Sequence, residues 1–155
     1  SGPIALPDAT ACGVRLGLVL LLISCGLGGF AQIWGAWQLS RGYPPEYWGS
    51  GGVLKFPHGA AIHAVQLLPA VAAIANRCSP KTALRCVLLT GLSQCLVLGY
   101  ALRQTLLDRS RFELDATGSL LLGGAASALL LALVLGVCGF VCQQTAPANL
   151  HKTAS

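Results

Sequence analysis

Two histidines and a glutamine are the residues best suited to chemistry in an otherwise apolar stretch. His63 and Gln66 are three residues apart, so they share one face of a helix, and His58 precedes His63 by five residues. Five residues at about 100° each place the two imidazoles about 140° apart around that helix. They are therefore not expected to bind one metal ion together, and we predict no metal site.

A single histidine can still hold a cofactor. We consider that His63, with Gln66 and His58 nearby, binds a pigment, a haem or a quinone that is shared with a partner chain. A haem held within this chain alone is not favoured, because His151 lies in the polar tail and the sequence contains no Met. The alternative for His63 is a structural one, a hydrogen bond between helices.

The cysteines form no redox motif. Two of them, Cys138 and Cys142, are four residues apart on one helical face, but no C-x-x-C pair occurs among the seven. We therefore expect buried, apolar roles for these thiols. A membrane thiol oxidoreductase is the weakest of the functions considered, and the sequence identifies no catalytic residue.

Composition decides the class of protein. Of 155 residues, 54% are hydrophobic and 10% are charged, whereas soluble domains carry roughly 25% charged residues. The net charge of +5 is scattered between apolar runs, without the basic face of a nucleic-acid-binding protein. The chain is predicted to be an integral membrane protein that does not bind nucleic acid.

Four apolar stretches are long enough to cross a bilayer, which takes roughly 20 helical residues. They run over about 14–39, 58–76, 84–102 and 119–142. We predict an all-α protein, with residues 1–155 forming one domain of four transmembrane helices in an up-down bundle. Pro69 removes a backbone donor and predicts a kink in the second span.

Small residues at four-residue spacing let membrane helices approach closely. The predicted packing seams lie on the fourth and third spans, at Gly124, Ala128, Ala132, Gly136, Gly91, Cys95 and Gly99. Such seams could join the four helices to one another or could bind other membrane subunits.

Aromatic residues follow the first span. Tyr and Trp concentrate at the level of the lipid headgroups, and the predicted interfacial anchors are Trp34, Trp37, Tyr43, Tyr47 and Trp48. Lys and Arg number five on each side of the membrane and so do not decide the orientation. The turn at 77–85 is basic and free of acids, whereas the loop at 103–118 contains three acids, so both termini are predicted to be cytoplasmic.

The pattern Gly-Gly-x-Leu-Lys-x-Pro-His at 51–58, continued by His-Ala-x-Gln-x-Leu-Pro at 63–69, resembles a family of uncharacterised bacterial four-helix integral membrane proteins. Residues 101–104, Ala-Leu-Arg-Gln, are similar in a less specific way. The resemblance implies a four-helix fold in the bacterial cytoplasmic membrane and draws attention to His58, His63 and Gln66. That family often has Asp where this chain has Val53.

The preferred functional hypothesis is a non-enzymatic accessory or assembly subunit of a larger membrane complex. It depends on the small-residue seams and on the lack of a catalytic motif. A subunit that binds a pigment, haem or quinone at His63 is the alternative.

Overall fold

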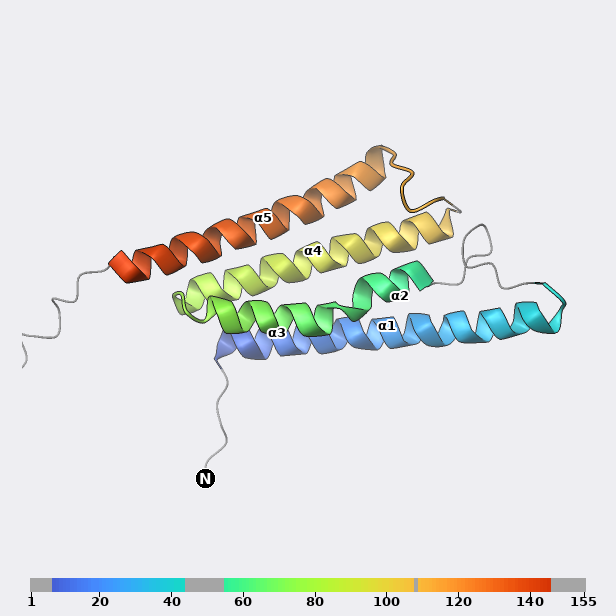
Figure 1. Ribbon diagram of the computed structural model, residues 1–155, viewed down its shortest axis with the longest axis horizontal. Helices are drawn as coiled ribbons and strands as arrows, with labels where there is room; N and C mark the ends of the chain where they lie inside the picture. The colour runs from blue at the N-terminus through green and yellow to red at the C-terminus, as the bar shows by residue number, and fades with distance from the viewer. Residues whose placement is uncertain (1–6, 44–54, 108, 146–155) are drawn as a thin grey trace, which may run out of the picture.

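The computed structural model describes residues 7–43, 55–107 and 109–145, and every regular element in these ranges is an α-helix (Figure 1). The helices are α1 Asp8–Ser40, α2 Lys55–Ile62, α3 Ala64–Ala75, α4 Pro80–Leu106 and α5 Ala116–Thr145. Together α2 and α3 make one span, and with α1, α4 and α5 they give four helical segments long and apolar enough to cross a membrane. The predicted all-helical class is confirmed, and so is the number of segments long and apolar enough to cross a membrane.

The helices extend beyond the predicted spans because their ends carry their own stop and start signals. Ser79 caps α4 by accepting the Thr82 N–H at 3.3 Å, and Pro80 occupies the first turn, where no intrahelical donor is needed. After α1, Gly42 adopts a φ of +78°, the left-handed conformation that commonly ends a helix. Thus α1 reaches 33 residues, about 50 Å at 1.5 Å per residue, which is more than the hydrocarbon core requires.

The helices lie side by side and alternate in direction (Figure 1). α4 is central, with α2 and α3 packed between it and α1 on one side and α5 packed along its other side. The principal buried cluster contains mostly alanine: Ala9, Leu20, Ala61, Ala64, Leu68, Ala72, Ala75, Ala83, Cys86, Val87 and Leu98. Small side chains therefore set the distance between helices, as expected for association within lipid.

The closest approach is between α1 and α3. A Cβ atom added at Gly13 would lie 2.9 Å from the Leu68 carbonyl oxygen, and one added at Gly17 would lie 3.1 Å from Val65 Cα. These obstacles are backbone atoms, which cannot rotate away. Gly13 and Gly17 therefore form a glycine seam on the first span that the sequence analysis did not identify.

The second span is interrupted at His63, between α2 and α3. The helix α3 runs through Pro69, and the interruption lies six residues before this proline. Proline crowds the carbonyl four residues before it, so the distortion falls on the preceding turn. Beyond the break, the N–H groups of Gln66 and Leu67 both bond to the His63 carbonyl, at 3.2 and 3.0 Å.

The predicted seam on the fourth span faces α4. Ala128 and Ala132 are buried, and added Cβ atoms at Gly124 and Gly136 would meet Leu96 and Cys86. On α4 the seam is less continuous. Gly91 is buried against Leu16, whereas Cys95 is exposed and Gly99 has open space beside it.

Candidate functional site

His63 and Gln66 are exposed at the middle of the second span. They lie at and just after the break between α2 and α3, within the 21-residue segment Lys55–Ala75. Neither side chain makes a hydrogen bond or ion pair within the described residues. The interhelical hydrogen bond considered for His63 is not found among the described residues, and both side chains are available to a group outside this chain.

His58 has the opposite environment. Its Nδ1 lies 3.0 Å from Ser24 Oγ and 2.8 Å from the Ser24 carbonyl oxygen, and the Ser24 hydroxyl is also within 3.1 Å of the His58 carbonyl. Its ring packs on Gly28, where an added Cβ would lie 3.0 Å from the imidazole. His58 thus joins α2 to α1, and it points away from the face that carries His63.

Ser24 is fully buried, and it is the partner of His58 in this contact. Replacing Ser24 with alanine is expected to lower the free energy of unfolding by about 0.6–1.5 kcal/mol, the range for an interhelical hydrogen bond in a membrane protein. Thermal unfolding in detergent measures the change. Ser127→Ala on the exposed face of α5 is the control, and an equal effect of the two substitutions would contradict the assignment.

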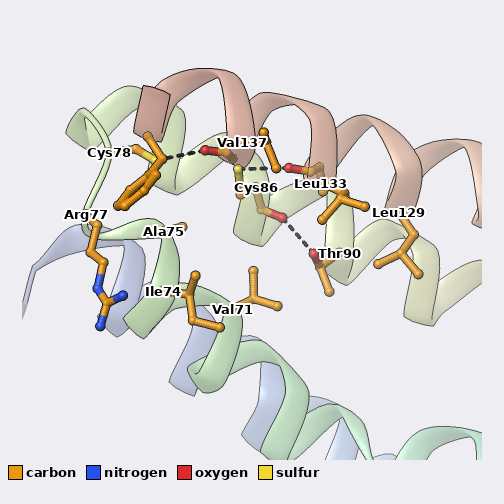
Figure 2. A pocket seen from close by; sticks show the side chains of 13 residues that line it. Val71, Ile74, Ala75, Arg77, Cys78, Cys86, Thr90, Leu129, Leu133 and Val137 are labelled. Carbon is orange, nitrogen blue, oxygen red and sulfur yellow. Dashed lines mark hydrogen bonds between the residues drawn. The ribbon is translucent and has the colours of Figure 1, made fainter. Parts of the chain in front are cut away.

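A second feature is a groove of about 580 Å³ between α3 and α5, with α4 as its floor (Figure 2). Its walls are apolar, and the residues that line it include Val71, Ile74, Cys86, Thr90, Leu129, Leu133, Val137 and Phe140. Ligand pockets typically measure 300–1,000 Å³. The groove is therefore large enough for a small ligand or for part of a lipid.

The two thiols and the hydroxyl in the groove are satisfied within the chain. The Cys78 thiol donates to the Gly136 carbonyl and the Cys86 thiol to the Ala132 carbonyl, both at 3.3 Å, and the Thr90 hydroxyl donates to the Cys86 carbonyl at 2.8 Å (Figure 2). These two thiols hold α4 and its preceding turn to α5. Cys138 and Cys142 are exposed on α5, so the expectation that both are buried is wrong, and each of the seven cysteines is a free thiol.

Aromatic side chains gather at the end of α1. Phe30 stacks on Trp34 with ring centroids 6.2 Å apart, and Trp34 stacks on Trp37 at 4.7 Å. The Arg41 guanidinium lies 4.4 Å from the centre of a Trp37 ring. Tyr43 is exposed next to this group. The other two predicted anchors, Tyr47 and Trp48, and the Gly-Gly pair at 51–52 lie outside the described residues.

Arg103, Arg109, Glu113 and Asp115 form three ion pairs at the connection between α4 and α5. Asp115 accepts from Arg103 at 2.9 and 2.6 Å and from Arg109 at 2.6 Å, and its Oδ1 also accepts the Gly118 N–H at 2.8 Å. The last contact makes Asp115 the cap of α5. These bonds lower the pKa of Asp115 from 3.8 to about 2, the Gly118 N–H contributing most.

Because folding stabilises the Asp115 carboxylate, the free energy of unfolding is expected to decrease at acidic pH. The contribution of Asp115 is complete above its unfolded pKa of 3.8 and is lost as the pH falls through about 2. Unfolding temperatures measured between pH 6 and pH 2 should fall mainly below pH 4. In Asp115→Asn the temperature should be lower at pH 6, and the acid-dependent fall should be smaller. An unchanged fall in the variant would assign the acid sensitivity to another group.

Metal binding has no support within the described ranges, where no cluster of three or more His, Cys, Asp or Glu side chains is found. The sequence-predicted candidates divide into two places: His63 and Gln66 lie on an exposed face, and His58 lies in a helix contact. No known family model matches the chain, and comparisons with curated proteins and with solved structures find no match either.

Proposed function

We propose that this chain is an integral membrane protein that acts as a non-enzymatic accessory or assembly subunit of a larger membrane complex. The observation that carries the proposal is the exposed pair His63 and Gln66 at mid-span, which makes no hydrogen bond within the described residues. Polar side chains within a membrane are costly when they face lipid, and they normally face protein or a water-filled cavity. A neighbouring transmembrane helix that hydrogen-bonds to this pair would remove the cost.

The partner's chemistry follows from the two side chains. A neutral imidazole and an amide each offer donors and acceptors, so the partner helix is expected to present a polar side chain at the same depth. The seam of α5 is not the partner surface in this proposal, since Ala128 and Ala132 are already buried in this chain.

The test replaces both side chains with leucine. His63→Leu/Gln66→Leu should keep the wild-type unfolding temperature, because no hydrogen bond within the described chain is lost, but should no longer co-elute with a membrane complex in mild detergent. Ser127→Leu, an exposed polar position on α5, is the control because a serine hydroxyl can bond to its own helix. Co-elution of the double variant at the wild-type level would contradict the proposal.

A second candidate is a cofactor-binding subunit, and the free imidazole of His63 favours it. A pigment or haem needs an open nitrogen on an accessible histidine, and a quinone oxygen could accept from His63 or Gln66. An absorption spectrum of the protein isolated from its own membrane distinguishes the two coloured cofactors. A visible band that His63→Leu removes and Ser127→Leu retains would favour this function over an assembly role.

We also propose that both termini are cytoplasmic and that the membrane is the bacterial cytoplasmic membrane. The ion pairs of Arg103 and Arg109 with Asp115 support this orientation, because they neutralise positive charge on the opposite side. Arg77, Lys81 and Arg85 make no ion pair in the described chain. The resemblance of residues 51–69 to bacterial membrane proteins supports the location.

A further inference from the structure

We infer that the groove between α3 and α5 binds one anionic phospholipid, with an acyl chain in the groove and the phosphate at Arg77. This binding site is separate from the His63 and Gln66 surface on which the proposed function depends. Its lining is apolar, and Arg77 is the one charged residue among the side chains that line it.

The shape of the groove favours a chain-like apolar ligand. Ile74 on α3 and Leu133 and Val137 on α5 line the groove and are 67%, 62% and 56% exposed, so the groove is open at the side rather than enclosed. For helices that span a bilayer, this opening faces the hydrocarbon region. An acyl chain can enter there directly from the membrane, and it gains packing against both walls.

The polar groups of the floor do not select a hydrogen-bonding ligand. The Thr90 hydroxyl and the Cys78 and Cys86 thiols already donate to carbonyls of the chain. The carbonyl oxygens of a quinone would therefore find no free side-chain donor among these three residues. Discrimination between ligands is thus left to the end of the groove, where Arg77 lies (Figure 2).

The charge at that end favours a phosphate. Arg77 is exposed and has no carboxylate partner in the described chain, and Lys81 and Arg85 follow on the adjacent turns of α4. A guanidinium can hold two phosphate oxygens at once, and a basic residue near a membrane surface contributes about 1 kcal/mol to binding anionic lipid. This energy corresponds to about fivefold in affinity.

The test is a titration with dioleoyl-phosphatidylglycerol, followed by native mass spectrometry of the full chain in mild detergent, with dioleoyl-phosphatidylcholine as the zwitterionic comparison. Wild type should retain one phosphatidylglycerol. Arg77→Gln should bind it about fivefold more weakly, with little change for phosphatidylcholine. Arg85→Gln, at the same end but outside the groove, should bind it more tightly than Arg77→Gln does.

The groove itself is tested with tryptophan. Val137→Trp should fill it and abolish retention of both lipids, whereas Leu131→Trp, exposed on α5 away from the groove, should leave retention unchanged. Leu133→Trp gives the same test if Val137→Trp does not fold. Equal binding by Arg77→Gln and wild type, equal retention by the Val137 and Leu131 variants, or recovery of a stoichiometric quinone or a partner helix in the groove would each overturn the inference.

Discussion

Replacing Gly13 or Gly17 with alanine is expected to lower the free energy of unfolding by about 1–3 kcal/mol, the range for inserting a methyl group where packing is complete. The reason is steric. The new Cβ would lie 2.9 Å from the Leu68 carbonyl oxygen in one case and 3.1 Å from Val65 Cα in the other. Either substitution must push α1 away from α3, which loosens the contact that holds the first span. Reversible unfolding in mixed micelles measures the loss.

Gly26 supplies the control on the same helix. No atom lies within 4 Å of a Cβ added there, and alanine has a higher helix propensity than glycine by about 1 kcal/mol. Gly26→Ala should therefore be neutral or stabilising. If the Gly13 and Gly26 variants unfolded at the same temperature, the close approach of α1 and α3 would not exist in the protein.

The second large effect is expected at Gln104. This side chain is 1% exposed, and its Nε2 lies 3.0 Å from the Tyr100 hydroxyl, 2.9 Å from the Ser110 carbonyl oxygen and 2.5 Å from the Glu113 carbonyl oxygen. Gln104→Leu removes the donor of all three hydrogen bonds, and an intramolecular hydrogen bond contributes about 0.5–1.5 kcal/mol to stability. We expect a loss of about 2–4 kcal/mol and faster proteolysis of the segment between α4 and α5.

Thr105→Val is the matched substitution for Gln104→Leu. The Thr105 hydroxyl donates only to the Ala101 carbonyl of its own helix, at 2.9 Å, so its removal should cost little. Proteolysis of both variants in the same detergent compares them directly. Cleavage of Gln104→Leu at the rate of Thr105→Val would show that the connection is held by other contacts.

The spans could be predicted from the sequence because hydrocarbon thickness sets their length. The helix ends could not be predicted as well, since capping by Ser79 and Asp115 extends helices past the apolar runs. The packing of Ala128 and Ala132 followed from four-residue spacing. The same spacing occurs at Gly13 and Gly17, but Gly13 lies just before the predicted start of the first span, so the sequence does not single out this pair as a transmembrane seam.

The histidines show where reasoning from one sequence stops. Helical geometry predicted that His58 and His63 face different directions, and they do. It could not predict which of them faces inward, because this depends on Ser24, which is 34 residues from His58 in sequence. Gln104 was overlooked for a related reason. Two of its three partners, Ser110 and Glu113, belong to an irregular loop, whose path a hydropathy pattern does not describe.

The central claim is that a partner helix covers His63 and Gln66, and crosslinking in intact membranes tests it most directly. A photoreactive amino acid at position 66 should form a discrete protein adduct. The same group at position 130, on the lipid-exposed side of α5 where Leu130 is 61% exposed, should react with lipid only. Lipid adducts alone at both positions would contradict the claim.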